Sequence, residues 1–124
     1  PQHPQVKGSE RPSTGHDGIF LVSPRSVEDY ISEFRPMQLR DKRTVKVSEN
    51  APAINFGDAK GLTFERVLIY PTKPILAWLK DCNSKLEPKS RAKLYVAITR
   101  AMHSVAFIDD TIDSDKLSFI HRWR

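Results

Sequence analysis

Three short runs of consecutive hydrophobic residues stand out along the chain, at residues 19–22, 67–70 and 105–108. Polar or turn-forming residues follow each run, among them Ser23-Pro24 after the first and Asp109-Asp110 after the last. A run of about four apolar residues without polar alternation is typical of a strand that is buried on both faces, as in a parallel sheet. The pattern therefore predicts three central strands of a parallel sheet.

Between the first two runs, hydrophobic residues recur at the three- and four-residue spacing of an amphipathic helix. Val27, Tyr30, Ile31 and Phe34 form this stripe and predict a helix over residues 27–34. A capping box of Ser26 and Asp29 would start the helix, and Pro36 would end it, because the residue before a proline disfavours the helical conformation.

Weaker patterns predict four further elements. The first is a strand over residues 44–47, and the last is a short helix over residues 114–121. Between them, a helix is expected from Pro74 to Cys82, with an apolar face of Ile75, Leu76 and Leu79. Another helix is expected after the cap Ser90, with an inner stripe of Leu94, Ala97, Ile98 and Ala101. Strands that alternate with helices favour an α/β fold with a mostly parallel sheet flanked by helices.

The first 18 residues have a different composition. They hold three prolines and three of the five glycines, and Val6 is their only aliphatic residue. Such a segment buries too little apolar area to offset its ordering entropy, so residues 1–18 are expected to be a flexible lead-in. Residues 19–124 then form one domain of ordinary size. Because the chain starts at Pro1 without an initiator methionine, we expect it to be a piece of a longer protein.

Charge and cysteine content narrow the possible partners and sites. Twenty Lys and Arg against 15 Asp and Glu give a net charge of +5, which suggests an anionic partner such as nucleic acid. The basic residues are dispersed, however, and a solvated basic surface explains them too. Cys82 is the only cysteine, which excludes an internal disulfide and predicts a reducing, cytoplasmic setting. The longest apolar stretches are far shorter than the ~20 residues of a membrane span.

Two segments carry a more specific signal. Residues 57–70 read Gly-Asp-Ala-Lys-Gly-Leu-Thr-Phe-Glu-Arg-Val-Leu-Ile-Tyr, and residues 94–101 read Leu-Tyr-Val-Ala-Ile-Thr-Arg-Ala. In this order they resemble motifs V and VI of superfamily 1 DNA helicases of the UvrD/Rep/PcrA kind. The resemblance covers roughly residues 54–109 and implies the second RecA-like motor domain of such an enzyme.

Arg100 is the candidate catalytic residue. It is expected near the end of a helix, where its planar and permanently charged guanidinium suits a phosphate oxygen. The resemblance implies an arginine finger that contacts the γ-phosphate of ATP across the cleft between two motor domains. Without the resemblance, Arg100 would be a solvated arginine stabilised by the helix dipole.

The loop of Lys60, Gly61 and Thr63 is the second candidate site. Gly61 precedes a strand and allows the close backbone approach that a phosphate or sugar contact requires, although an ordinary turn glycine fits the pattern too. The resemblance implies that Gly61 and Thr63 bind ATP and that Lys60 contacts a DNA phosphate. Thr63 stands where many relatives have Glu and Gly57 where many have His, while Met102 replaces a frequent basic residue, which indicates a divergent branch.

The chain contains no Gly-x-x-x-x-Gly-Lys-Ser/Thr segment, which would cradle the phosphates of ATP. The resemblance therefore implies a fragment of an ATP-dependent helicase. ATP, Mg²⁺, single-stranded or duplex DNA and a first RecA-like motor domain would be its ligands and partners in the full-length enzyme, and the fragment alone would be inactive. One alternative is a stand-alone, non-catalytic module that binds nucleic acid or protein. Another is an unrelated α/β protein with chance matches.

Other residues with possible chemistry have simpler explanations. Tyr95, Trp78 and Trp123 are expected to pack on the domain rather than to stack on bases. An acidic group at the end of the last run is expected to be a solvated turn, because it lacks the pattern of a calcium loop; it comprises Asp109, Asp110, Asp113 and Asp115.

Overall fold

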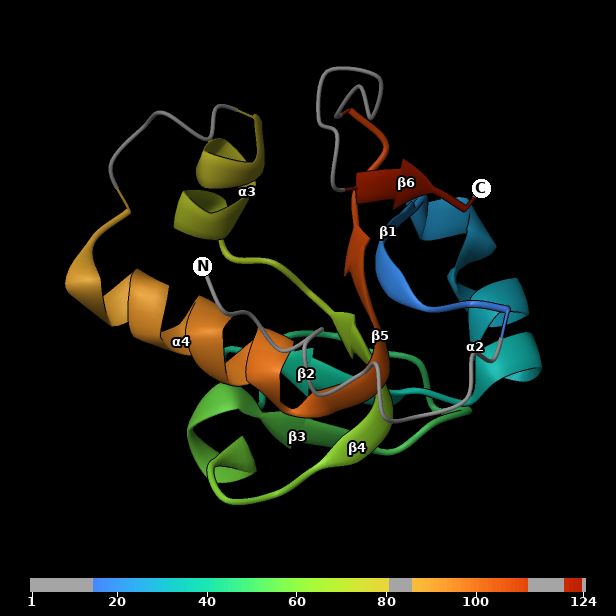
Figure 1. Cartoon of the computed structure of the whole chain (residues 1–124), viewed down its shortest axis with the longest axis horizontal. Helices are drawn as coiled ribbons and strands as arrows, with labels where there is room; N and C mark the ends of the chain where they lie inside the picture. The colour runs from blue at the N-terminus through green and yellow to red at the C-terminus, as the bar shows by residue number, and fades with distance from the viewer. Residues whose placement is uncertain (1–14, 81–85, 112–119, 124) are drawn as a thin grey trace.

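The computed structural model describes residues 15–80, 86–111 and 120–123. Its strands form one sheet in the order β3-β2-β4-β5-β1-β6, and every neighbouring pair is parallel (Figure 1). The strands are β1 (Gly18–Val22), β2 (Met37–Arg40), β3 (Ala53–Asn55), β4 (Phe64–Ile69), β5 (Ala101–Ile108) and β6 (Ile120–Arg122). The helices are α2 (Val27–Phe34), α3 (Lys73–Lys80) and α4 (Pro88–Thr99), with 3₁₀ turns η1 (Pro24–Ser26) and η2 (Phe56–Ala59). The predicted α/β fold with a parallel sheet is confirmed, and it is consistent with a RecA-like or Rossmann-type arrangement.

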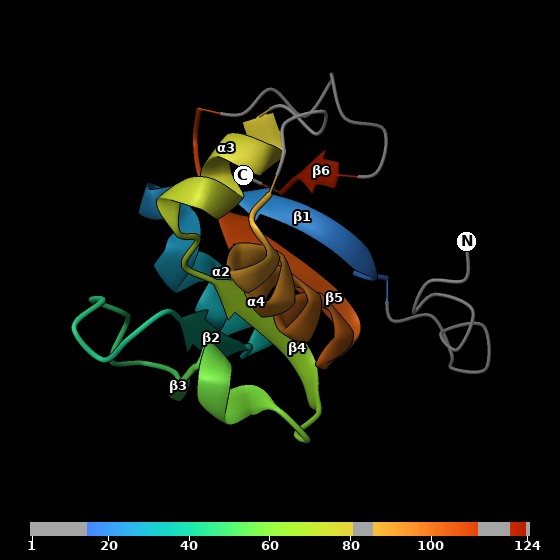
Figure 2. The same ribbon diagram turned by 90° about the vertical axis from the view of Figure 1, so that its left-hand side faces the viewer.

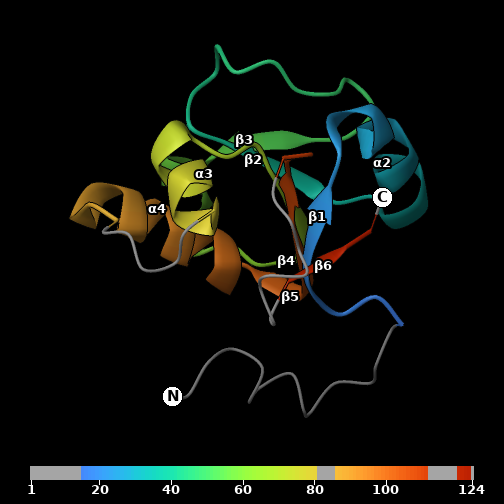
Figure 3. The same cartoon turned by 90° about the horizontal axis from the view of Figure 1, so that it is seen from above.

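Helices cover both faces of the sheet. Figure 2 shows α3 and α4 in front of the strands and α2 behind them, and Figure 3 shows the same two layers from above. Successive residues of the central strands alternate between the two cores, because side chains of a strand point to opposite faces. In β4, Val67 and Ile69 pack on the side of α3 and α4, and Leu68 packs on the side of α2. This double burial explains why the central strands are continuous apolar runs.

Several predicted elements are confirmed. The first helix occupies residues 27–34 as predicted, and Arg35 ends it in the left-handed conformation, with φ 50° and ψ 55°. The second helix starts at Lys73 with Pro74 in its first turn and buries Ile75 and Leu79. Cys82, its predicted end, lies outside the described residues.

The edge of the sheet differs from the prediction. Residues 44–47 are not a strand; β2 and β3 lie on either side of them in the chain and pair with each other, and β3 is the edge strand. The buried amide of Gln38 explains the difference, because it holds the connecting loop by hydrogen bonds to Ser48 and Ala51. The loop backbone at Ser48 thus pairs with a side chain rather than with a strand.

The helix starts also differ from the predictions. Ser26 is the N-cap of α2 but makes no capping hydrogen bond, so the predicted capping box is wrong. Its hydroxyl instead accepts a hydrogen bond from Ser23 Oγ at 3.1 Å, because η1 leads directly into the helix. The helix α4 starts at Pro88, two residues before the predicted cap Ser90, since proline suits the first helical turn. It ends at Thr99, so Ala101 belongs to β5 and not to the helix stripe.

Both ends of the described chain pack against the sheet. The lead-in predicted for residues 1–18 lies mostly outside the described residues, but His16 is buried and Gly18 already belongs to β1. At the other end, residues 120–122 form β6 where the end of a short helix was predicted; residues 112–119 lie outside the described residues. Pairing of β6 with β1 buries Ile120, which explains the strand.

The acidic turn after β5 also differs from its prediction. Asp109 is buried rather than solvated, and its carboxylate accepts hydrogen bonds from the backbone N–H and the hydroxyl of Thr111. Arg122 donates to the Asp109 carbonyl at 2.6 Å, which ties β6 to the end of β5. Asp110 is exposed, and Asp113 and Asp115 lie outside the described residues.

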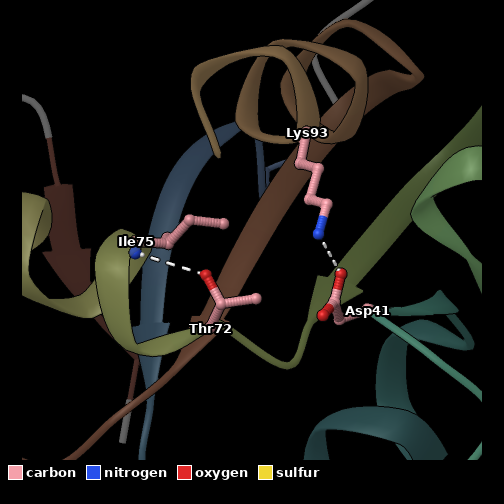
Figure 4. Close-up of polar contacts among 4 residues, drawn as sticks. All are labelled: Asp41, Thr72, Ile75 and Lys93. Carbon is pink, nitrogen blue, oxygen red and sulfur yellow. Dashed lines mark hydrogen bonds and ion pairs between the residues drawn. The ribbon is translucent and has the colours of Figure 1, made fainter. Parts of the chain in front are cut away.

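Two polar contacts connect the helices to the carboxyl edge of the sheet (Figure 4). Lys93 of α4 forms an ion pair with Asp41, which directly follows β2. Thr72 Oγ1 accepts a hydrogen bond from the backbone N–H of Ile75 at 3.4 Å, at the start of α3. Both helices are thereby fixed at the edge opposite to the candidate site. None of the helices that the structure describes is long and apolar enough to cross a membrane.

Candidate functional site

The two motif-like segments meet at the amino edge of the sheet. The loop of residues 60–63 leads into β4, and Arg100 leads into β5, which is its parallel neighbour. The first paired residues are Phe64 and Ala101, and the backbone N–H of Phe64 donates to the carbonyl of Arg100 at 2.7 Å. Since both strands start at the same level, residues 38 positions apart in sequence come into contact.

Arg100 occupies the C-cap of α4, and its backbone N–H donates to the Val96 carbonyl. Its side chain is half-buried and turns towards the loop before β4. One terminal nitrogen donates to the Leu62 carbonyl at 3.4 Å, and the other donates to Thr99 Oγ1 at 3.3 Å. Nε is buried and has no hydrogen-bond partner among the described residues. The guanidinium is therefore positioned by long contacts and retains donor capacity for a stronger acceptor such as a phosphate oxygen.

Thr99 supports the arginine from the same helix end. Its hydroxyl donates to the Tyr95 carbonyl at 2.7 Å, one helical turn earlier, and accepts from Arg100. A hydroxyl that donates back along the helix has its lone pairs free for the guanidinium. Thr99 thus orients Arg100. From the sequence alone, only its position next to Arg100 in the motif-like segment indicated such a role.

Gly61 requires its glycine for conformational reasons. Its φ is +81°, in the left-handed region that residues with a Cβ rarely adopt. A Cβ built on Gly61 would meet nothing within 4 Å, so the space beside the backbone is open. The loop turns here, and the Leu62 N–H donates to the Ala59 carbonyl at 3.1 Å. The turn presents the Leu62 carbonyl to Arg100 and leaves room for a ligand against the Gly61 backbone.

Lys60 and Thr63 lie in the same loop, on either side of Gly61 and Leu62. Both are exposed, and the side chain of neither forms a hydrogen bond or an ion pair with another described residue. The sequence-predicted residues Lys60, Gly61, Thr63 and Arg100 therefore share one surface, and Arg100 contacts the loop directly.

The prediction for Tyr95 is wrong. We expected Tyr95 to pack half-buried on the sheet, but its side chain is 67% exposed, because the inner face of α4 is supplied by Leu94 and Ala97. Leu62 is 44% exposed. No other large hydrophobic side chain of residues 15–80, 86–111 and 120–123 is exposed. The carbonyl of Leu62 contacts Arg100, and Tyr95 lies five residues before Arg100 in the last part of α4. We call Lys60, Gly61, Leu62, Tyr95 and Arg100 the Arg100 face.

Charges of both signs lie near this face, because the exposed residues Asp58 and Glu65 are close to Lys60 in the chain, and further basic residues lie in the first half of α4. The helix α4 contains Lys89, Arg91 and Lys93 and no acidic residue. Lys93 is paired with Asp41, whereas Lys89 and Arg91 are exposed. Among the described residues, no group of three or more His, Cys, Asp or Glu side chains is placed to hold a metal ion. The arrangement suits the binding of an anion by arginine and backbone groups.

The tryptophans do not extend the site. Trp78 packs against the core beneath α3, and Trp123 packs edge-on against Tyr30, with 5.0 Å between ring centroids. Packing was the predicted role of both. Comparisons with known proteins add no further information on the Arg100 face: no protein-family model matches the chain, and no curated protein matches it.

Proposed function

We propose that this chain is the second RecA-like motor domain of a UvrD-like superfamily 1 DNA helicase. The full-length protein would couple ATP hydrolysis to translocation on single-stranded DNA and to duplex unwinding. The observation that carries the proposal is the contact of Arg100 with the loop before β4. The two segments that resemble motifs V and VI form one surface there, although they lie 38 residues apart at that contact.

In this proposal, Arg100 acts across a cleft on ATP that a first motor domain holds. A guanidinium aimed at the γ-phosphate neutralises the charge that spreads over its oxygens in the transition state. Mg²⁺ bound with the nucleotide would share this neutralisation. The Nε of Arg100 lacks an acceptor among the described residues, so the guanidinium gains a hydrogen bond if it reorients towards a phosphate.

The exposed hydrophobic residues support a protein partner at the same surface. Large exposed apolar side chains that gather at one place commonly mark an interaction site. Leu62 and Tyr95 belong to the Arg100 face, so a first motor domain that delivers ATP to Arg100 would also cover them. The absence of a phosphate-cradling glycine-rich segment from this chain is consistent with a nucleotide that is held mainly by that partner.

Substitution of Lys60 tests whether the loop before β4 contacts DNA. We expect Lys60→Ala to weaken binding of single-stranded DNA about fivefold at 0.1 M salt, because loss of one phosphate contact lowers the salt slope by about 0.7. Lys46→Ala is the matched control, since Lys46 is also exposed but lies in the loop after β2 and not in the loop before β4. Fluorescence anisotropy over a salt series measures both variants. Equal slopes for both variants would contradict the placement of DNA on this loop.

A further inference from the structure

The segment that enters β1 is fastened by a histidine between two aromatic rings. The His16 ring lies 3.8 Å from the Phe20 ring and 3.8 Å from the Phe34 ring, with interplanar angles of 14° and 16°. Its Nε2 is 2.9 Å from the Tyr30 hydroxyl, and only 7% of the residue is exposed. Phe20 belongs to β1, and Tyr30 and Phe34 belong to α2, so His16 joins the incoming chain to both elements.

A second contact holds the backbone of the same residue. Arg66 of β4 donates to the His16 carbonyl and to Ser104 Oγ, and its guanidinium carbon lies 5.1 Å from the centre of the Phe34 ring. We call the space between the Phe20 and Phe34 rings, in which the His16 ring lies, the aromatic slot. The face of an aromatic ring attracts a cation, and Arg66 already supplies that cation here. A second cation in the slot, on the imidazole of His16, would be repelled by the first.

We propose that His16 is a pH-sensitive latch, whose neutral ring fastens the segment before β1 to α2 and whose protonation releases that segment. The latch acts locally: residues 15–17 and the start of β1 leave the aromatic slot, while the sheet and its two helix layers stay in place. The proposal concerns the face of the sheet opposite to α4 and does not depend on the proposed helicase function.

The electrostatics of the slot favour the neutral ring. Burial, and secondarily the Arg66 guanidinium, lower the pKa of His16 from 6.5 to about 4, while Asp17 acts weakly in the opposite direction. A histidine whose pKa is depressed by folding stabilises the folded contact above its ordinary pKa and loses that contribution as the pH falls. The latch is therefore fully closed above pH 6.5, weakens below it and opens as the pH approaches about 4.

Three further titratable groups lie near the slot. Burial, and to a smaller extent the Glu33 carboxylate of α2, raise the pKa of Tyr30, and His103 of β5 lies 3.7 Å from Asp17. His121 of β6 lies beside Phe20, with 6.2 Å between ring centroids. A test must therefore alter His16 and leave these three groups unchanged.

Trp123 supplies a local reporter. Its ring contacts Tyr30 and Phe34 edge-on, at 5.0 and 5.6 Å between centroids. Because the chain has two tryptophans, the replacement Trp78→Phe makes Trp123 the only one. Its emission should change when His16 leaves the slot, since the environment of both contacted rings changes.

The experiment is a pH titration of the 124-residue chain from pH 7.5 to 3.5. In the chain without substitutions, NMR should show that the His16 ring titrates near pH 4 and not near 6.5. In the Trp78→Phe chain, Trp123 emission should change between pH 6.5 and 4 while far-UV circular dichroism keeps its native amplitude. The added substitution His16→Phe, which keeps an aromatic ring in the slot, should abolish the emission change.

Three results would overturn the latch. They are titration of His16 near its ordinary pKa, an emission change that persists with His16→Phe, and an emission change that coincides with loss of secondary structure. The last result would mean global acid unfolding rather than local release. If His16→Phe does not fold, the NMR titration of the chain without substitutions still tests the proposal, because titration of His16 near its ordinary pKa would overturn it.

Discussion

Replacement of Arg100 by alanine is expected to lower kcat for ATP hydrolysis by about 10³- to 10⁵-fold in the full-length helicase that we propose. The reason is that an arginine finger neutralises charge that develops only in the transition state, so its loss raises the barrier without removing the ground-state contacts of ATP. Binding of single-stranded DNA should remain mostly intact, because the proposal assigns the DNA contact to Lys60 and not to Arg100. Steady-state hydrolysis with saturating DNA measures the effect.

Two control variants distinguish a role of Arg100 in ATP hydrolysis from a role in stabilising the fold. Arg91→Ala removes another arginine of α4, one that is exposed, and should leave kcat within about twofold. Arg100→Lys keeps the charge but not the planar fork, and should recover little of the lost rate. Unchanged hydrolysis with Arg100→Ala would refute the arginine-finger role. Loss of the folded state in that variant, seen as a lower urea midpoint, would attribute the effect to the contacts with Leu62 and Thr99 instead.

The largest effect on stability is expected at Gln38. Its fully buried amide donates to the carbonyls of Ser48 and Ala51 and accepts from the Ser48 N–H and the Tyr70 hydroxyl. Burial raises the pKa of the Tyr70 phenol, which keeps this hydroxyl protonated and able to donate. We expect Gln38→Ala to lower the free energy of unfolding by about 3 kcal/mol, because it opens a cavity and leaves buried polar groups unpaired. Urea denaturation measures the change.

Two further variants divide that loss into its parts. Gln38→Leu refills the space without restoring hydrogen bonds, so it should recover only the cavity contribution. Tyr70→Phe removes the hydrogen bond to Gln38 and the longer one, at 3.3 Å, that the hydroxyl accepts from the Ser48 N–H, and should cost about 1 kcal/mol. A loss below about 0.5 kcal/mol for Gln38→Ala would show that the loop of residues 41–52 is not held by this amide.

The central part of the fold could be predicted from the sequence because double burial leaves a strong local pattern. Strands β1, β4 and β5 bury both faces, so their apolar runs are continuous and easy to recognise. The edge strand β3 and its neighbour β2 leave no such pattern, since the buried residue Gln38 is polar and residues 53–55 are only half-buried. The order of the strands depends on contacts between distant segments, which no local pattern encodes.

The candidate site was partly predictable for a similar reason. Gly61 and Arg100 stand in two specific segments, and their order along the chain agreed with the resemblance. The exposure of Tyr95 could not be derived from its helical position. The spacing of Leu94, Ala97 and Ile98 indicates which side of α4 is buried, but not how far around the helix the burial extends. His16 was missed as well: it follows a polar, glycine-rich segment, and its slot is formed by rings from β1 and α2.

The most direct measurement is DNA-stimulated ATP hydrolysis by the 124-residue chain alone, beside the full-length helicase to which we propose that it belongs. We expect background rates from the chain alone, because it lacks a glycine-rich phosphate cradle, and stimulated hydrolysis from the full-length protein. Clear turnover by the chain alone that Arg100→Ala abolishes would contradict the proposal that this domain supplies only one half of a shared active site. Absence of hydrolysis in the full-length protein would contradict the helicase function itself and favour a non-catalytic interaction module.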